Sequence, residues 1–375
     1  DRLRSRGLGD VYKRQDKLRP MDAFKDSAPA ELVDCVGHDD LMVLMFTSGT
    51  TGRSKAVMLS ERNFFTTVEC QVKFGDAMLD YKHEHMPEDK DDVLSNFAIL
   101  PLFHLGTFIC LFVWACKGWA LNLSADIRDF YRDLGLMHSD AIAVAPMLME
   151  AIYKDVKRGR RARLNGIWNP CGSSAMFDGA MLAELARQGM MITQVYGMTE
   201  TCGDGIINYE QDEKHIRAVG KPDDHAEYKL DETGEICIRG GCVMLGYYKD
   251  PEATAEVLDA DGWFHTGDLA RVDEDGFYYI TGRKKNIIIL DNGENVSPEE
   301  LENLLSKCEA VKECIVREKG KKICAVIYCG EADQQIVRDF ITETNRTLPL
   351  YKRMSAVEFS TEPLPRTGTG KLLRK

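Results

Sequence analysis

A segment of small polar residues at positions 47–55 reads Thr-Ser-Gly-Thr-Thr-Gly-Arg-Ser-Lys. Its glycines let the backbone approach a polyphosphate, its N–H groups and hydroxyls supply hydrogen-bond donors, and Lys55 adds a positive charge. The spacing from glycine to lysine differs from that of a Walker A loop. A flexible linker is the alternative, but an apolar run at 41–46, typical of a buried strand, directly precedes the segment. We therefore predict a phosphate-binding loop.

A second segment, at positions 194–201, reads Gln-Val-Tyr-Gly-Met-Thr-Glu-Thr. A strand here would deliver an aromatic ring, a glycine and then polar groups to one point. Tyr196 could stack on a nucleobase and Thr199 could bond a phosphate. Glu200 could hold Mg²⁺, which prefers carboxylate and phosphate oxygens. Taken alone, the stretch would be interpreted as an ordinary strand and turn.

Three single residues complete the set. Asp268 ends the run Gly-Trp-Phe-His-Thr-Gly-Asp, Arg283 follows Thr-Gly, and Lys371 ends the run Pro-Arg-Thr-Gly-Thr-Gly-Lys. An Asp after Gly is usually part of a turn, and a basic chain end is usually frayed. A lysine on a glycine-rich loop can, however, be moved toward a charged centre.

In order and content, these motifs resemble the adenylate-forming superfamily of AMP-dependent synthetases and ligases. This superfamily includes acyl-CoA synthetases, firefly luciferase and the adenylation domains of nonribosomal peptide synthetases. The resemblance covers residues 41–375. The runs Gly-Tyr-Tyr at 246–248, Asp-Pro-Glu-Ala-Thr at 250–254 and Gly-Arg-Lys-Lys at 282–285 resemble the acyl-CoA synthetase version. Long-chain and other fatty acyl-CoA synthetases are the expected nearest relatives.

The resemblance implies a role for each matching residue. Residues 47–55 would hold the β- and γ-phosphates, Tyr196 would stack on adenine, Asp268 would bind the ribose hydroxyls, and Glu200 would bind Mg²⁺. The residues implied in ATP and AMP binding are Thr47, Ser48, Gly49, Thr50, Thr51, Gly52, Lys55, Ser173, Ser174, Tyr196, Gly197, Thr199, Asp268 and Arg283. Those implied in catalysis are Lys371, Thr199, Glu200 and His104, while Lys285 is the implied hinge and Gly293 lines the implied CoA tunnel.

The implied chemistry has two steps and uses ATP, Mg²⁺ and coenzyme A. A carboxylate attacks the α-phosphorus of ATP, which releases pyrophosphate and leaves an acyl-adenylate. Lys371, Mg²⁺ and oriented N–H groups would offset the crowding of two anions. A CoA thiolate then displaces AMP, after the small domain has rotated about its hinge. A hydrophobic acid, such as a fatty acid, is favoured by the apolar residues 102–114.

Two other functions remain open, and the sequence departs from the family pattern in places. The enzyme could load a carrier protein instead of CoA, or the chain could be an inactive nucleotide-binding fragment, because it begins shortly before the phosphate loop. Ser54 replaces a common proline. Ser173 and Ser174 replace a common Gly-Gly, which would strain the backbone if positive φ is required there.

Strands and helices alternate along the first two thirds of the chain. Strands are expected at 41–46, 56–59, 97–100, 141–145, 166–170 and 192–196, and helices at 60–70, after Pro146 and at 178–188. This alternation predicts an α/β, doubly wound large domain. Short β-type runs between 220 and 281 predict a β-rich subdomain. A small α+β C-terminal domain should follow, its first helix capped by Ser297 with Pro298 next and Glu300 third.

Composition narrows the classes of protein. The formal net charge of -12 argues against broad nucleic-acid binding. Twelve cysteines without a C-x-x-C pair indicate reduced thiols and a cytoplasmic location. His83 and His85 are expected in a solvated loop rather than a metal site. The apolar stretch at 97–115 is interrupted by Pro101 and reads as a strand, loop and helix rather than a membrane span, although peripheral membrane contact stays open.

The beginning of the chain is unlike the rest. Residues 1–15 are basic with little apolar periodicity, and we interpret them as a non-native leader. We expect a large adenylation domain at 16–282, incomplete at its N-terminus, and a small mobile domain at 283–375. The oligomeric state is not indicated.

Overall fold

A computed structural model describes residues 37–47, 55–124, 126–173, 177–203, 205–290, 294–366 and 372–373. Apart from Gly37, these residues belong to one compact unit, His38–Lys375. The leader expected at 1–15 lies outside the described residues.

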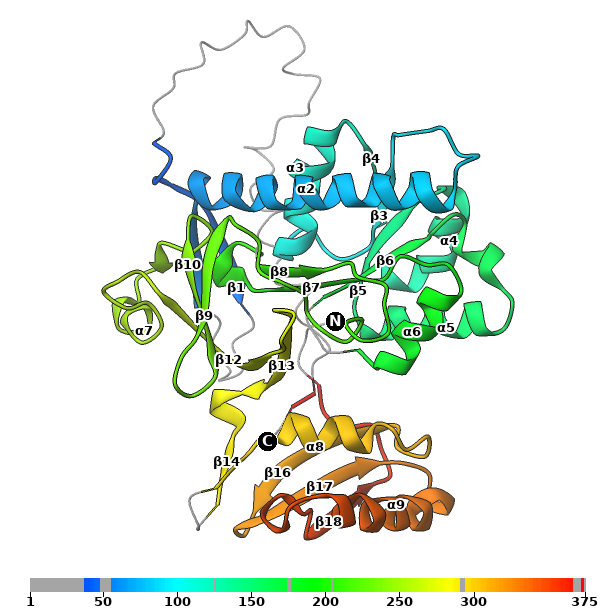
Figure 1. Cartoon of the computed structure of the whole chain (residues 1–375), viewed down its shortest axis with the longest axis vertical. Coiled ribbons are helices and arrows are strands. Elements are labelled where there is room, and N and C mark those ends of the chain that lie inside the picture. The colour runs from blue at the N-terminus through cyan, green and yellow to red at the C-terminus, as the bar shows by residue number, and fades with distance from the viewer. Residues whose placement is uncertain are drawn as a thin grey trace, which may run out of the picture. The chain divides into compact units, whose positions relative to one another are not determined.

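A six-stranded sheet forms the centre of the large domain (Figure 1). Its strand order is β4-β3-β5-β6-β7-β8, parallel throughout except that β8 runs antiparallel to β7. The strands are β3 (Ser95–Ala98), β4 (Ala120–Leu123), β5 (Ala141–Val144), β6 (Asn169–Ser173), β7 (Thr193–Gly197) and β8 (Gly205–Asn208). The doubly wound α/β fold is therefore confirmed.

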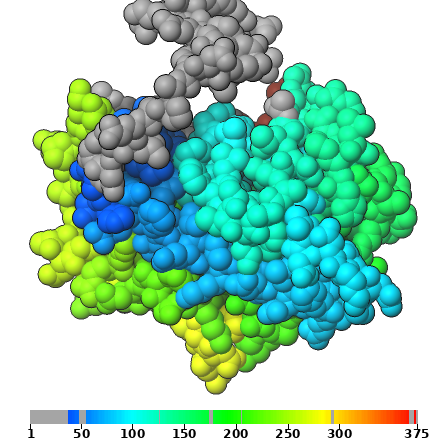
Figure 2. Space-filling model, turned by 90° about the horizontal axis from the view of Figure 1, so that it is seen from above, coloured from blue at the N-terminus to red at the C-terminus, as the bar shows by residue number. Residues whose placement is uncertain are grey.

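Helices cover both faces of this sheet, as the alternation of strand side chains requires. In β5, Ala141 packs into a core with α2 and α3, whereas the next residue, Ile142, packs into a second core with α4, α5 and α6. Residues of α2 and α3 lie side by side on the face shown in Figure 2. The helices are α2 (Glu61–His85), α3 (Leu105–Lys117), α4 (Phe130–Leu136), α5 (Pro146–Lys157) and α6 (Gly179–Arg187), with 3₁₀ turns η3 (Ile127–Asp129) and η4 (Arg161–Leu164).

Helix α2 begins where the sequence predicts but is much longer. Ser60 Oγ accepts the N–H of Asn63 at 3.3 Å, and Asn63 Oδ1 accepts the N–H of Ser60 at 2.7 Å. The helix then continues to His85, so the loop expected around His83 and His85 is wrong. The His85 ring stacks on Tyr81 at 4.0 Å, and His83 Nε2 lies 2.7 Å from Asp92. Contacts with neighbouring residues thus hold these histidines on the last helical turn.

The strand expected at 166–170 begins later, at Asn169. Gly166 has φ +105° and lies in the turn before the strand. The chain turns at Gly166, a conformation that glycine adopts without steric cost, and β6 starts after this turn. The stretch at 97–115 divides into β3 and α3 as predicted, and no helix among the described residues is long and apolar enough to cross a membrane.

The β-rich subdomain is confirmed and contains two antiparallel sheets. One has the order β13-β12-β10-β9 and the other β1-β2-β11. The elements are β1 (Leu41–Thr47), β2 (Lys55–Ser60), β9 (Ala226–Leu230), β10 (Glu235–Gly240), β11 (Gly246–Tyr247), α7 (Pro251–Ala255), β12 (Phe264–Val272) and β13 (Tyr278–Arg283). In the chain, the 3₁₀ turn η5 (Thr199–Thr201) lies between β7 and β8.

The C-terminal part is α+β, as expected. Strand β17 pairs antiparallel with β16 and parallel with β18, and α8 and α9 pack on this sheet around a core that includes Leu301, Val316 and Val337. Ser297 Oγ accepts the N–H of Glu300 at 3.4 Å, which confirms the predicted cap. The elements are η6 (Lys284–Asn286), β14 (Ile288–Ile289), β15 (Asn295–Val296), α8 (Pro298–Leu305), β16 (Glu313–Lys319), β17 (Lys322–Tyr328), η7 (Glu331–Asp333), α9 (Gln334–Thr347), η8 (Leu350–Lys352) and β18 (Ala356–Ser360).

Candidate active site

The predicted site residues of the large domain gather at the carboxyl edge of the parallel sheet. Thr199 and Glu200 directly follow the end of β7, and Ser173, the last residue of β6, pairs with Val195 of β7. Ligands of open α/β sheets bind outside this edge. Ser173 is in an extended strand and is not among the residues with positive φ, so the strain considered for it does not arise.

The buried carboxylate of Asp268 contacts two other predicted site residues, Arg283 and Tyr196. Asp268, 5% exposed, pairs across β12 and β13 with Arg283, whose Nε lies 2.6 Å from Asp268 Oδ1. The hydroxyl of Tyr196 donates to Asp268 Oδ2 at 3.1 Å. Strand pairing thus places Arg283 opposite Asp268, while the end of β7 brings Tyr196 to the same carboxylate. We call these three residues the Asp268 cluster.

Burial and charge in the Asp268 cluster raise the pKa values of Tyr196 and Arg283. Burial, helped by the negative charge of Asp268, raises the pKa of Tyr196 well above its usual value. Burial acts to lower the pKa of Arg283, but the charge and hydrogen bond of Asp268 outweigh it, so this pKa is raised. Tyr196 is therefore a neutral donor and Arg283 a fixed cation.

A second group forms at the base of the predicted phosphate loop. Thr47 and Lys55 are paired residues at the ends of β1 and β2, so residues 48–54 connect the two strands of a hairpin. Lys55 Nζ lies 4.3 Å from the centre of the Tyr247 ring, within cation–π range. The Tyr247 hydroxyl donates to Glu200 Oε1 at 2.9 Å. The β1–β2 hairpin, which carries the predicted phosphate loop, is thus linked to Glu200 through Lys55 and Tyr247.

Tyr247 belongs to the candidate active site, although the sequence motifs do not single it out. It appears there only within the run Gly-Tyr-Tyr, as a marker of resemblance. Its partner Glu200 is 47 positions away in the chain, and strand β11 brings it close by pairing Tyr247 with Val57 of β2. Burial and the nearby Glu200 charge raise the pKa of Tyr247, so its hydroxyl stays protonated. The Glu200 charge also helps to raise the pKa of Arg283, which couples the two groups.

The position of the Glu200 carboxylate is compatible with its predicted role as a magnesium ligand. Its Oε1 accepts the Tyr247 hydroxyl, and within the described residues no hydrogen bond or ion pair is found at Oε2. A carboxylate oxygen is the donor type that Mg²⁺ prefers, and the neighbouring hairpin is the one predicted to bind phosphate.

His104 lies at the N-cap of α3 and is exposed. A Cβ added to Gly203 would lie 3.6 Å from Leu105, so the first turn of α3 contacts the turn that follows Glu200. His104 is therefore near the carboxyl edge of the sheet. Its catalytic role stays a prediction.

Lys285 lies in η6, between the last strand of the subdomain and the C-terminal part. The preceding residue, Lys284, donates to buried Glu235 at 2.7 Å. Ser297, the cap of α8, donates to the Thr281 carbonyl at 2.7 Å. A Cβ on Gly282 would lie 2.4 Å from Ser297 Oγ, so glycine is required for this close contact. Lys285 and Arg283 also line a cavity of about 590 Å³.

Several predicted site residues lie outside the described residues. They are Ser48, Gly49, Thr50, Thr51, Gly52, Ser174, Gly293 and Lys371. The roles of these residues stay predictions.

Comparison with known proteins defines the family. A family model described as AMP-binding enzyme matches residues 6–248, and one described as AMP-binding enzyme C-terminal domain matches residues 300–371. The chain belongs to the AMP-binding enzymes.

The relatives carry the names of CoA ligases and synthases. The chain is 30% identical to 4-coumarate--CoA ligase 3 of Oryza sativa subsp. japonica, over 94% of this chain and 66% of that protein. It is 31% identical to the long-chain-fatty-acid--CoA ligase of Salmonella typhimurium, over 90% and 61%. It is also 31% identical to a feruloyl-CoA synthase of Amycolatopsis sp, over 93% and 71%. The chain thus spans less than two thirds of the first two relatives.

Solved structures share the fold. An O-succinylbenzoate coenzyme A synthetase from Bacillus subtilis, in complex with AMP, matches with a TM-score of 0.75 at 24% identity, over 97% of this chain and 74% of that chain. ATP-bound MatB from Rhodopseudomonas palustris matches with a TM-score of 0.74 at 25% identity, over 94% and 70%.

Proposed function

We propose that this protein is an AMP-forming acid–CoA ligase. It would use ATP to convert a carboxylic acid into an acyl-adenylate and then transfer the acyl group to CoA. The observation that carries the proposal is that one short segment at the end of β7 supplies both groups, with Tyr196 bonded to Asp268 and Glu200 bonded to Tyr247, and that the Glu200 charge acts on Arg283. The Asp268 cluster suits a nucleoside, and the group of Glu200, Tyr247 and Lys55 suits the phosphates of the same nucleotide. The names of the relatives, all CoA ligases or synthases, support the same reaction.

The nucleoside end would bind ATP through fixed groups. Asp268 would accept hydrogen bonds from the ribose hydroxyls, because its contacts with Arg283 and Tyr196 hold the carboxylate in place. Tyr196 would stack on adenine while its hydroxyl stays bonded to Asp268 at 3.1 Å. Holding both partners before the ligand arrives reduces the ordering cost of binding. Ser173 and Gly197, at the ends of adjacent strands, would line the adenine side.

At the phosphate end, the chain would offset negative charge. Lys55 and the loop at 48–52 would contact the β- and γ-phosphates, Thr199 would bond the α-phosphate, and Glu200 would hold Mg²⁺. Bound Mg²⁺ would supply charge neutralisation at the phosphates. Lys371 would bridge the carboxylate and the α-phosphate as the acyl–phosphate bond forms and the bond to pyrophosphate breaks. Such oriented charges are typically worth ~2.7–4 kcal/mol each in the transition state.

In the second step the CoA sulfur would attack the acyl carbonyl carbon. The bond to the AMP oxygen breaks, AMP leaves, and a thioester remains. Rotation at Lys285 would withdraw Lys371 and bring Gly293 to the pantetheine path, a hinge motion at a few residues. The Ser297–Thr281 bond would have to break or rearrange in this motion.

The substrate we propose is a hydrophobic carboxylic acid, with a fatty acid as the first candidate. In the stretch at 102–114, Leu105 and Ile109 are buried in a core, while Leu102 and Phe103 are exposed beside His104. Exposed apolar side chains at the edge of a site suit an apolar ligand. The relatives' names include both a long-chain fatty acid and the aromatic acids 4-coumarate and ferulate. We further propose a cytoplasmic enzyme.

The test uses the whole chain with ATP, Mg²⁺, CoA and one acid at a time: palmitate, 4-coumarate or ferulate. Chromatography of the products should show AMP, pyrophosphate and an acyl-CoA. ADP in place of AMP would overturn the proposal. Acyl-adenylate without thioester would favour transfer to a carrier protein, and ATP binding without turnover would favour an inactive fragment.

Lys371→Ala tests the division of labour between the two steps. We expect loss of adenylation but retention of thioester formation from a supplied acyl-adenylate, because the lysine would act only in the first step. Equal loss of both steps would contradict this role.

A further inference from the structure

A cluster of three potential metal ligands lies away from the candidate active site. Cys70 is on α2, whereas Asp223 and His225 are in the connection between β8 and β9 (Figure 1). Cys70 Sγ lies 2.5 Å from Asp223 Oδ2, and His225 Nδ1 lies 3.1 Å from the same oxygen. The three ligand atoms all lie within 4.8 Å of one another. We propose that Cys70, Asp223 and His225 form a binding site for a zinc-like divalent metal ion.

The donor types support a borderline-soft metal. A thiolate, an imidazole and a carboxylate are the ligands that Zn²⁺ uses, and a hard ion such as Mg²⁺ or Ca²⁺ would be served by oxygen alone. Cys70 is 4% exposed, and its sulfur contacts Asp223. The backbone N–H of His225 donates to Asp223 Oδ1 at 3.0 Å, which turns Oδ2 toward both the sulfur and the imidazole.

The geometry requires only a small adjustment. In a tetrahedral zinc site the ligand atoms are separated by roughly 3.3–3.6 Å, given the usual metal–ligand distances. The distance between the imidazole nitrogen and the carboxylate oxygen is close to this range. The carboxylate oxygen would have to move about 1 Å away from the sulfur. Asp223 is in a loop and partly exposed, so this movement is feasible. The metal ion would take the place of the protons through which the thiol and the imidazole contact one carboxylate. The thiol proton would be released, and the neutral imidazole would carry its proton on Nε2.

A fourth ligand position is available from either of two sources. Cys70 and Asp223 line a cavity of about 220 Å³, from which water could coordinate. Asp224 is the other source, because its Oδ1 lies 3.6 Å from His225 Nδ1. Asp224 is also paired with Lys73 at 2.9 Å, so water is the simpler choice. The metal ion would then have three protein ligands and one position open to water.

The site would tie α2 to the β-rich subdomain. Helix α2 begins directly after β2, which belongs to the phosphate-loop hairpin. A metal ion between α2 and the β8–β9 connection would therefore hold the hairpin's helix against the subdomain. Because the metal binds the folded chain, it should also raise the thermal unfolding temperature.

The test titrates the metal-free, reduced whole chain with Co²⁺, which gives a thiolate-to-metal absorption band. We expect a band that saturates at one equivalent, competition by Zn²⁺, and a Zn²⁺-dependent rise in unfolding temperature. Cys70→Ser should remove the band, and His225→Ala should weaken binding roughly 100-fold or more. Cys116→Ser, which changes an exposed cysteine, is the matched control and should leave the titration unchanged.

No band in the wild type, or an identical band in Cys70→Ser, would overturn the proposal. Circular dichroism of each metal-free variant shows whether it folds. If Cys70→Ser fails to fold, His225→Ala decides the question, because unchanged Co²⁺ affinity in that variant would also overturn the site. None of these measurements depends on the proposed ligase activity.

Discussion

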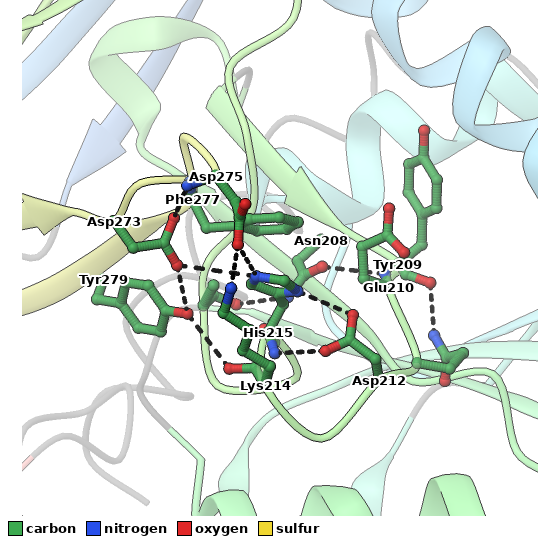
Figure 3. Close-up of polar contacts among 12 residues, drawn as sticks. Asn208, Tyr209, Glu210, Asp212, Lys214, His215, Asp273, Asp275, Phe277 and Tyr279 are labelled. Carbon is green, nitrogen blue, oxygen red and sulfur yellow. Dashed lines mark hydrogen bonds and ion pairs between the residues drawn. The ribbon is translucent and has the colours of Figure 1, made fainter.

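The β12–β13 hairpin carries a polar cluster at each end, and the two differ in what surrounds them. At the open end Asp268 pairs with Arg283 and accepts from Tyr196. At the turn, Asp273 and Asp275 face His215, as Figure 3 shows. Each cluster combines a carboxylate, a cationic side chain and an aromatic ring. The residue types in the two clusters therefore do not show which of them is a binding site.

The turn cluster is satisfied by its own members. Asp273 Oδ1 accepts backbone N–H groups of Asp275 and Phe277 at 3.1 and 2.9 Å. The His215 ring stacks on Phe277 at 4.0 Å, and its Nδ1 lies 2.9 Å from Asp212. Lys214 also contacts Asp275. These contacts fix the turn against the 209–218 segment and suit a structural role.

The Asp268 cluster, in contrast, lies near the carboxyl edge of the parallel sheet, and Arg283 borders a cavity. Its residues come from three strands, whereas those of the turn cluster come from a turn and the 209–218 segment. Location relative to the sheet edge, more than the number of charges, therefore distinguishes a candidate binding group from a structural one.

The largest expected difference between the clusters is in activity. Asp268→Asn keeps the size of the side chain but removes the charge that would hold the ribose and orient Arg283. We expect kcat/KM for ATP to fall roughly 100- to 1000-fold, comparable to loss of an oriented transition-state contact. His215→Gln, at the other end of the hairpin, should stay within about twofold of wild type. Similar losses in both variants would remove the distinction between the two clusters.

A smaller effect is expected at the phosphate end. Tyr247→Phe removes the hydroxyl that positions Glu200 but keeps the ring beneath Lys55. A hydrogen bond to a charged group contributes ~1.5–3 kcal/mol, so we expect roughly a tenfold or greater fall in kcat/KM for MgATP. The Mg²⁺ concentration that gives half-maximal rate should also change. Tyr248→Phe, which alters the exposed neighbouring tyrosine, is the control; a loss of the same size there would argue against the Glu200 contact as the cause.

The smallest effect is on stability at the turn. The hydrogen bond to Asp212, together with one to Asp275, raises the pKa of His215 above 6.5. The folded chain then binds this proton more tightly than the unfolded chain does. The stabilisation is full below about pH 6.5 and is lost as pH rises through the folded-state pKa.

Urea unfolding at several pH values between about 6 and 9 measures this effect. The free energy of unfolding of the wild type should decline across this range more than that of His215→Gln. Parallel pH profiles for the two proteins would show that His215 does not supply the dependence.

Local signals explain which parts of the fold could be predicted from sequence. The caps at Ser60 and Ser297 depend on neighbouring residues, and both are confirmed. The length of α2 was missed because nothing in the sequence ends the helix at Cys70. Gly75, in its middle, is accommodated against Trp119, since an added Cβ would lie 3.2 Å from that ring.

Contacts between distant segments were the least predictable. The family resemblance implies a nucleotide-binding role for Asp268 and for Arg283, and strand register explains why the two residues pair. The Tyr247–Glu200 and Cys70–Asp223 contacts join residues 47 and 153 positions apart, for which the sequence carries no local pattern.

The most direct test of the central claim is exchange of labelled pyrophosphate into ATP by the whole chain. An adenylate-forming site predicts exchange that requires both Mg²⁺ and the carboxylic acid, that does not require CoA, and that is strongly reduced by Asp268→Asn. Exchange that is independent of the acid, or turnover that releases ADP and phosphate without any exchange, would contradict the account.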